Sequence, residues 1–377
     1  MILVGLLPAV FAQETGEEPP SWYALPTFDF TSDTGFGFGV AGGLYAHRDG
    51  VRPYKSAIEL DLYATTKRIQ NHQLWFEVLQ LADRPVRLQG SVGFTASVSD
   101  NFCGIAGVPD CSTAAAQPGE SSSDNVVRYS APTGMLSMLW EPASWPLGLM
   151  GGWYGARYRP GVLQETTPYA DSLYASLHPD GETGLYSTAM AGLRRDSRDD
   201  EIDPRRGLQA DISVRGSHAV IGSRWAGAGI NATAIGYLTL HESLVSATRM
   251  VVDRVWGELP TLELSRFGGW SPGSGLGGDM GRGIRADRYV GRRKSMGQQE
   301  LRWMPLHPSV WGAPLGLGVV GFFDAGVVAD GEDAVAAWGT GGGIRIDVSD
   351  FVFRFDMGFS PVEDWQPYGY LDFGHAF

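Results

Sequence analysis

The sequence has little cysteine, little basic charge and no long apolar stretch beyond its first residues. Its formal net charge is −13, and its Lys and Arg residues form no run longer than three. This disfavours a nucleic-acid partner, which would require a basic face. No apolar stretch after the N-terminus reaches the ~18 residues of a transmembrane helix. The strands of a transmembrane barrel, however, alternate in polarity and keep the average hydropathy near neutral.

The only cysteines, Cys103 and Cys111, are close together in the sequence. In an exported chain, such a pair indicates one local disulfide within a loop. A metal site would need further ligands, and no His lies nearby in the sequence. We therefore expect a disulfide here, and no metal or other cofactor.

Residues 1–12 form an apolar run. Small residues at Val10 and Ala12 fit a signal-peptidase site, so we expect a signal peptide, although its usual positively charged start is missing. Either the start codon is wrongly placed or the segment is truncated. The alternative interpretation of residues 1–12 is a short buried N-terminal strand. Residues 13–21, with their acids and prolines, are expected to be a flexible leader, and residues 22–377 the folded domain.

Apolar and polar residues alternate with period two through much of the chain. Clear apolar positions are Ile58, Leu60, Leu62, Leu208, Ala210, Ile212, Ile344, Ile346, Phe353 and Phe355. Charged residues on the other face include Glu59, Asp61, Asp211, Arg215, Arg345, Asp347, Arg354 and Asp356. Because successive side chains of a strand point to opposite faces, each such strand has one apolar face and one charged face suited to a wet interior.

About sixteen such segments, each of a length typical of barrel strands, predict an all-β fold. Most of the long connections follow odd-numbered strands, at roughly 99–125, 159–182, 258–290 and 360–367. Transmembrane barrels sort their connections in this way, with short periplasmic turns and long outer loops. A soluble β-sandwich shows the same alternation but has no reason to sort its loops. The sequence therefore predicts a transmembrane antiparallel β-barrel integral to the bacterial outer membrane.

The chain ends on an alternating aromatic pattern. We expect Leu371, Phe373, His375 and Phe377 to share one face of the last strand. A terminal aromatic on such a strand resembles the signal that assembly machinery reads in outer-membrane barrels, and this assigns Phe373 and Phe377 to an assembly signal. The alternative is a C-terminal strand that happens to end in Phe.

Four motifs follow one another in the second half of the chain. They are Arg195-Asp196-Ser197-Arg198-Asp199 with Asp203-Pro204-Arg205-Arg206-Gly207, Phe267-Gly268-Gly269 with Gly281-Arg282-Gly283-Ile284, Gln299-Glu300-Leu301-Arg302-Trp303-Met304-Pro305, and Phe322-Phe323-Asp324-Ala325-Gly326. Each motif alone is weak, but their order at barrel spacing resembles the BamA-like outer-membrane protein assembly family, also called the bacterial surface antigen family. The resemblance covers about residues 190–377.

The resemblance implies a role for each motif, and the third and fourth correspond to the two family strands that follow its long loop. In the first, a periplasmic turn reverses the chain, and its residues are Asp196, Arg198, Pro204 and Gly207. The second corresponds to a long loop whose Arg-Gly tip folds back into the lumen. Here Gly281 stands where the family prefers an aliphatic residue, and Ile284 where it prefers an aromatic one. Family members usually carry periplasmic transport modules before the barrel, and we expect this chain to lack them, either naturally or through truncation.

The strand phase predicts which side chains the loop tip meets. Phe323, Ala325 and Val327 share the lipid face, so Asp324 and Gly326 point inward. By the same phase, Leu301 and Trp303 point outward, so Glu300 and Arg302 point inward.

We therefore expect Arg282 to bridge Asp324 and Glu300, which a guanidinium can do with its fixed fork of donors. Gly281 and Gly283 let the backbone approach the wall. A wet lumen is expected to screen this contact. In the alternative, Arg282 points into solvent while Asp324 pairs with another arginine, either Arg302 or Arg345.

The resemblance implies that the barrel assists the insertion, assembly or translocation of proteins at the outer membrane. Partner chains in the periplasm would supply client binding, outer-membrane lipid and lipopolysaccharide would surround the barrel, and the N-terminus would be periplasmic. The alternative is a passive pore or a structural subunit of a larger complex. An enzyme has the least support, since His241-Glu242-Ser243 lies at an expected turn and is typical of solvated turn residues.

Overall fold

The structure is a computed structural model. It describes residues 20–31, 35–66, 68–102, 104–106, 126–142, 144–160, 174, 177–178, 181–201, 203–269, 275–310, 313–348, 351–373 and 375–377. The expected signal peptide and the expected disulfide between Cys103 and Cys111 lie outside these residues. Within the described ranges, no helix is both long and apolar enough to cross a membrane.

The described residues form sixteen long strands and one strand of two residues. They are β1 (Ser21–Thr31), β2 (Gly35–Arg48), β3 (Val51–Thr65), β4 (Gln70–Val78), β5 (Val86–Asn101), β6 (Val126–Trp140), β7 (Gly148–Pro160), β8 (Gly184–Asp196), β9 (Gly207–Ser217), β10 (Gly227–His241), β11 (Leu244–Gly257), β12 (Arg293–Leu306), β13 (Ser309–Val310), β14 (Ala313–Asp330), β15 (Asp333–Val348), β16 (Phe351–Phe359) and β17 (Tyr368–Phe373). The prediction of about sixteen strands is confirmed.

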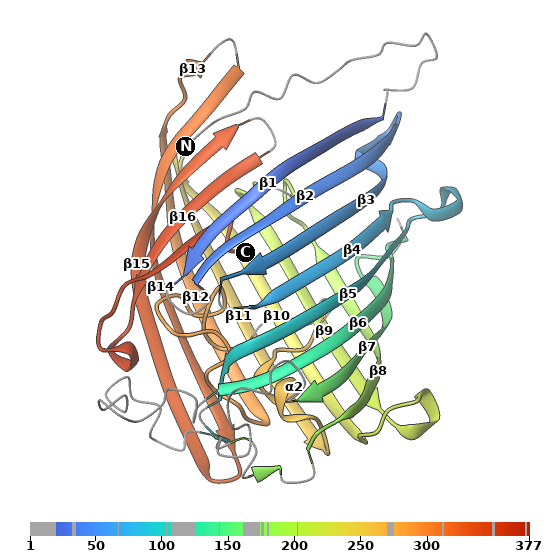
Figure 1. Cartoon of the computed structure of the whole chain (residues 1–377). Coiled ribbons are helices and arrows are strands. Elements are labelled where there is room, and N and C mark those ends of the chain that lie inside the picture. The colour runs from blue at the N-terminus through green and yellow to red at the C-terminus, as the bar shows by residue number, and fades with distance from the viewer. Residues whose placement is uncertain are drawn as a thin grey trace.

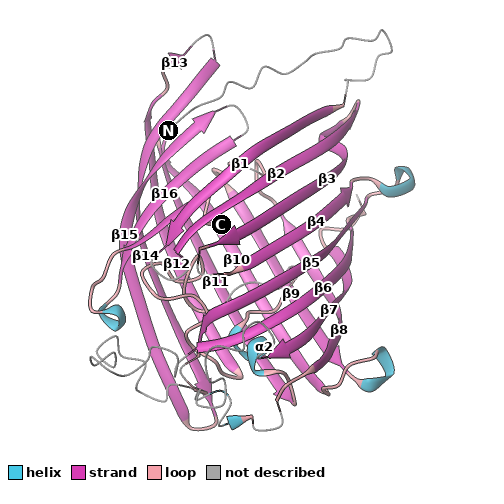
Figure 2. Ribbon diagram, viewed as in Figure 1, coloured by secondary structure: helices cyan, strands magenta, loops and turns pink. Residues whose placement is uncertain are grey.

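Strands that follow one another along the chain pair in antiparallel register from β1 to β17, with β12 pairing to β14 across the short β13. The sheet curls into a barrel, and β1 lies beside β17 where its two edges meet (Figure 1). The short helical segments α2 (Thr261–Ser265), η1 (Leu81–Asp83), η4 (Ala219–Ile221) and η5 (Pro361–Glu363) lie in the connections, as Figure 2 shows.

The two faces of the strands carry the side chains that the alternation predicts. On the outer face, Phe323 and Phe353 are 49% and 40% exposed. On the inner face, Glu300, Asp324 and Asp356 are 0% exposed. The apolar residues therefore face outward, where a membrane would contact them, and the charged residues face the lumen, which confirms the expected strand phase.

The connections differ at the two ends of the barrel. At one end, which we call the short-turn end, two residues join β2 to β3 and β10 to β11. The other end carries the long connections, including 258–292 between β11 and β12, and we call it the long-loop end (Figure 1). The sorting is not complete, because two residues also join β14 to β15 at the long-loop end.

The described parts of the long loop, 258–269 and 275–292, do not project from the barrel but fill part of the lumen. Two apolar clusters hold it there. One combines Leu259 and Leu264 of the loop with the inner faces of β6 to β8, and the other combines Phe267, Leu276 and Ile284 with the inner faces of β11 to β15. Because these loop side chains are buried, this part of the interior is a packed core and not a water-filled channel.

Candidate functional site

The candidate site lies where the tip of the long loop meets the inner wall. The alternation of β12, β14 and β16 turns one carboxylate of each strand inward: Glu300, Asp324 and Asp356. β12 pairs directly with β14, and β15 separates β14 from β16. Three acidic side chains therefore converge on one patch of wall, and the loop delivers Arg282 to it.

Arg282 binds all three carboxylates. Its Nε and Nη2 donate to the two oxygens of Asp324 at 2.9 and 3.0 Å, and its backbone N–H donates to Asp324 Oδ2 at 2.9 Å. Its Nη1 donates to Glu300 Oε1 at 2.5 Å and to Asp356 Oδ2 at 2.9 Å. The guanidinium fork matches a carboxylate geometrically, which the single ammonium of lysine cannot do. We call Arg282 and these three carboxylates the latch.

Two further arginines of the wall balance the acidic charge of the latch. Arg302 donates to Glu300 Oε2 at 2.8 Å, and Arg345 donates to Asp356 Oδ1 at 2.6 Å. Arg282 also stacks on the ring of Phe322, 3.7 Å from its centroid. Removing one member would leave buried charge without its partner, which is costly where water is excluded.

The expectation of a wet, screened latch is wrong. Arg282, Glu300 and Asp324 are each 0% exposed. The alternation correctly gave their direction, but it could not show that the loop itself covers the patch. The alternative pairing of Asp324 with Arg302 or Arg345 is not what the structure has, because those two arginines bind Glu300 and Asp356.

Small residues allow the loop tip to reach the wall. Gly283 has a φ of +91°, and a Cβ there would lie 2.6 Å from the backbone nitrogen of Phe359. A Cβ on Gly326 would lie 2.6 Å from Leu276 Cδ1, and one on Gly281 would lie 3.0 Å from the nitrogen of Gly277. Glycine is therefore required at Gly283 by both conformation and space.

Residues just after the tip tie the loop to the connection between β16 and β17. Arg288 donates to Glu363 Oε1 at 2.5 Å, and the backbone N–H of Arg285 donates to the same oxygen at 3.2 Å. The Gly283 N–H donates to the hydroxyl of Tyr370 on β17 at 2.8 Å. Sequence reasoning missed Glu363 and Tyr370, and it placed Asp356 in the lumen without assigning it to the latch.

The predicted turn motif joins β8 to β9. Asp196 accepts hydrogen bonds from the backbone N–H and the guanidinium of Arg198 at 2.6–3.1 Å. Asp199 accepts hydrogen bonds from the backbone N–H groups of Arg205 and Arg206 at 2.9 and 3.0 Å. Pro204 is buried, and Gly207 has a φ of +107° with no room for a Cβ. These contacts close the turn locally and do not reach the latch.

The expectation that His375 and Phe377 continue the last strand is wrong. β17 ends at Phe373. His375 Nε2 lies 2.9 Å from Asp203 Oδ1, and the ring of Phe377 lies 4.8 Å and 5.5 Å from the guanidiniums of Arg249 and Arg302. Cation–π attraction and the His–Asp contact thus draw these residues away from the strand path.

His241 and Ser243 are 3.3 Å apart at the exposed turn between β10 and β11. In the part of the chain that the structure describes, no group of three or more His, Cys, Asp or Glu residues could hold a metal ion.

Comparison with known proteins agrees with this architecture. The model of the Omp85 superfamily domain matches residues 80–370. BamA from Haemophilus ducreyi lacking POTRA domains 1–3 is a similar solved structure, with a TM-score of 0.57 and 14% identity over 95% of this chain and 70% of that one. CdiB from Escherichia coli (TM-score 0.61, 12% identity, 93% and 61% covered) and CdiB from Acinetobacter baumannii (0.56, 11%, 94% and 59%) are also similar. No curated protein sequence matches this chain.

The antiparallel barrel with its loop-filled lumen defines an outer-membrane β-barrel. Because the family model covers most of the chain, including the latch, the chain belongs to the Omp85 superfamily. This confirms the resemblance to BamA-like barrels. At a coarse level, membership places the chain among the barrels of outer-membrane protein insertion or translocation, which are not enzymes. The chain spans 70% of the BamA structure and about three fifths of the CdiB structures.

Proposed function

We propose that this barrel assists the insertion, assembly or translocation of other proteins at the bacterial outer membrane, together with periplasmic partner chains. The observation that carries this proposal is the buried latch, which lies within the region matched by the Omp85 model. A passive pore has no need to hold a loop across its lumen through three carboxylates. A barrel that handles other chains benefits from a loop fixed in one position.

The latch fixes that position in a specific way. Arg282 joins β12, β14 and β16, so the loop braces the part of the wall that leads to β17. β17 in turn lies beside β1, where the two edges of the sheet meet. We propose that the latch keeps this part of the wall in the geometry that client handling requires, and that its loss impairs function even where the barrel still folds.

Depletion of the chain in its host, followed by quantification of outer-membrane proteins, tests the proposal. We expect a defined set of outer-membrane or exported proteins to decrease. Wild-type protein should restore them, whereas Arg282→Ala and Arg282→Lys should not. Arg292→Ala is the matched control, since Arg292 is the last residue of the same loop and pairs with Asp330 at 2.7 Å but has a side chain that is 41% exposed. An unchanged outer-membrane proteome on depletion would contradict the proposal.

A passive pore or structural subunit is the second candidate. The inner face of β3 favours it, because Glu59 there is partly buried and Asp61 is exposed, and both would suit a wet passage. Conductance distinguishes the two. A steady open pore of the purified barrel, together with unchanged levels of other outer-membrane proteins on depletion, would support the pore.

Several finer features belong to the same proposal. We propose that residues 1–12 are a signal peptide, that the N-terminus is periplasmic, and that lipid and lipopolysaccharide surround the barrel. We also propose that Cys103 and Cys111 form a disulfide in a loop, and that Phe373 and Phe377 act as the assembly signal. A barrel variant lacking Phe377 should then accumulate in the periplasm or be degraded, whereas normal outer-membrane levels would argue against the signal.

A further inference from the structure

The first part of the long loop is held on a different part of the wall from its tip. Glu263 and Arg266, in and just after α2, meet Tyr154 and Tyr158 on the inner face of β7. We call these four residues the tyrosine anchor. We propose that the described parts of this loop, 258–269 and 275–292, form a plug with two separate anchors, and that the tyrosine anchor keeps the lumen closed when the latch is released.

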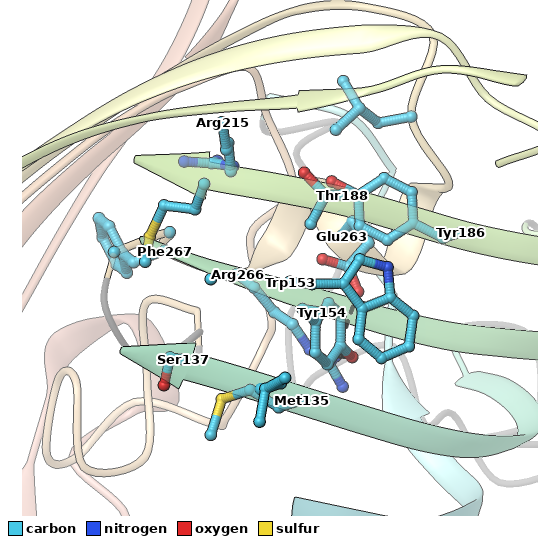
Figure 3. A pocket seen from close by; sticks show the side chains of 16 residues that line it. Met135, Ser137, Trp153, Tyr154, Tyr186, Thr188, Arg215, Glu263, Arg266 and Phe267 are labelled. Atoms are coloured by element: carbon cyan, nitrogen blue, oxygen red, sulfur yellow. Dashed lines mark hydrogen bonds and ion pairs between the residues drawn. The ribbon is translucent and has the colours of Figure 1, made fainter. Parts of the chain in front are cut away.

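The tyrosine anchor is a compact polar cluster. Glu263 Oε1 accepts a hydrogen bond from the hydroxyl of Tyr158 and lies 3.3 Å from Arg266 Nη1. The same Nη1 lies 3.1 Å from the hydroxyl of Tyr154 and 3.3 Å from that of Tyr158. Figure 3 shows the side chain of Arg266 beside Tyr154 in the pocket, with Glu263 nearby. An acid and a base of the loop are therefore neutralised together against the wall.

This cluster is buried within apolar surroundings. Tyr158 is 1% exposed and Leu264 is 2% exposed, and both belong to the apolar cluster that also includes Tyr129 and Tyr186. Lys294 on β12 holds the same segment from another side, since its ammonium donates to the carbonyl of Leu264 at 2.8 Å. The start of the loop thus has its own packing, which does not involve Arg282.

The two anchors share no side chain and use different strands. The latch binds β12, β14 and β16, whereas the tyrosine anchor binds β7, and strands β8 to β11 lie between them in the sheet. Between the anchors, the Gly268 N–H donates to Asp253 of β11 at 3.0 Å. Loss of the latch therefore removes contacts of the tip but none of the contacts of residues 258–268.

This arrangement separates movement of the tip from opening of the lumen. If the tip leaves β12 to β16, the segment 258–268 still packs against β6 to β8 and β11. The wall near β14 and β16 can then rearrange without a leak of small solutes. An open lumen requires that both anchors are released. The inference does not depend on which proteins the barrel handles, since it concerns only how the loop is held.

Conductance of the purified barrel in planar lipid bilayers tests the two-anchor plug. The variants are Arg282→Ala, the pair Glu263→Ala and Arg266→Ala, and the combination of all three. Removing Glu263 and Arg266 together leaves no orphan charge in the anchor. We expect Arg282→Ala to stay near the wild-type conductance and the combination to exceed it severalfold. The control is Tyr186→Phe in the Arg282→Ala background, because Tyr186 lines the same pocket but bonds Thr188 of its own strand.

Two outcomes would overturn the inference. Arg282→Ala alone could have as high a conductance as the combination, which would mean that the latch alone closes the lumen. Alternatively, the combination could remain as closed as Arg282→Ala, which would mean that the tyrosine anchor contributes nothing to closure.

A second measurement covers the case in which the combination does not fold, as judged by heat-modifiability. Hydrogen exchange of Arg282→Ala alone should then show lost protection at 275–290 and retained protection at 258–268. Loss of protection in both segments would equally overturn the inference.

Discussion

The inner walls of β1–β4 and of β12–β16 have the same alternating pattern but different environments. On the first wall, Glu59 is half-buried and Asp61 is exposed. On the second, Glu300, Asp324 and Asp356 are fully buried beneath the tip of the long loop. A carboxylate that points into a lumen is therefore a solvated surface charge on one wall and a member of a buried ionic cluster on the other.

The difference has energetic consequences. An ion pair near water contributes little to stability, with a typical value of about 0–1 kcal/mol. Breaking a buried pair by removing one partner costs about 3–5 kcal/mol, because the remaining charge is left without compensation. The comparison predicts that equivalent substitutions have unequal effects on the two walls.

The largest effect is expected at the latch. Arg282→Ala should destabilise the loop-bound state by about 3–5 kcal/mol, since it leaves three buried carboxylates with fewer donors. Asp324→Ala should have a similar effect, and the double variant should be no worse than either single one, because both remove the same interaction. Thermal unfolding and proteolysis of the loop measure this. Strictly additive single-variant effects would contradict a shared latch.

Glu300→Gln is a milder change on the same wall. It retains the shape of the side chain but removes the charge that faces Arg282, Arg302 and Arg345 at 2.5, 2.8 and 3.5 Å. We expect it to destabilise the barrel by more than the ~1 kcal/mol typical of an exposed pair. A smaller loss would indicate that water reaches the latch.

The sequence predicted the direction of the latch residues because that direction depends only on strand period. Once β12 and β14 are in phase, Glu300 and Asp324 must face inward. The four motifs then identified the loop that brings Arg282 to them. These features are local in sequence, and they needed no knowledge of how the lumen is filled.

Other features depend on contacts between distant segments, and the sequence did not reveal them. The tyrosine anchor joins Tyr158 to Glu263 across 105 positions. Neither residue belongs to a motif, and a Tyr on an alternating strand usually indicates only an amphipathic surface. The path of Phe377 was likewise mispredicted, because the alternation alone gives no sign that Arg249 and Arg302 draw the ring off the strand.

A further prediction compares the two faces of one strand. Phe353→Arg should cost about 2–4 kcal/mol, the penalty for an arginine that faces lipid near the membrane midplane. Arg354→Gln, one residue away and facing inward, should cost less, because Asp279, its partner at 2.9 Å, is itself half exposed. Heat-modifiability in detergent measures both. Equal losses would show that the assignment of inner and outer faces on β16 is wrong.

Another prediction compares two glycines of positive φ. Gly283→Ala should destabilise the loop tip by about 1–3 kcal/mol, because the residue must keep a strained conformation while its methyl group meets the backbone of Phe359. Gly331 has a φ of +55°, and a Cβ there would contact nothing within 4 Å. Gly331→Ala should therefore stay near the lower end of that range. Equal losses would mean that space at the wall does not limit the tip.

The smallest effect is expected on the β1–β4 wall. Glu59 accepts a hydrogen bond from the hydroxyl of Tyr45 at 2.5 Å, and this hydrogen bond is only partly buried. Glu59→Gln keeps an oxygen that can accept this bond, and nearby water can solvate whatever is left unpaired. We expect a loss below about 1 kcal/mol, the range of a typical net hydrogen bond. The same chemical change at Glu300 should cost more stability. The two variants together therefore isolate the effect of burying a carboxylate beneath the loop. If thermal unfolding shows equal losses at Glu59 and Glu300, the two walls do not differ in solvation, and the distinction between a covered and an open wall fails.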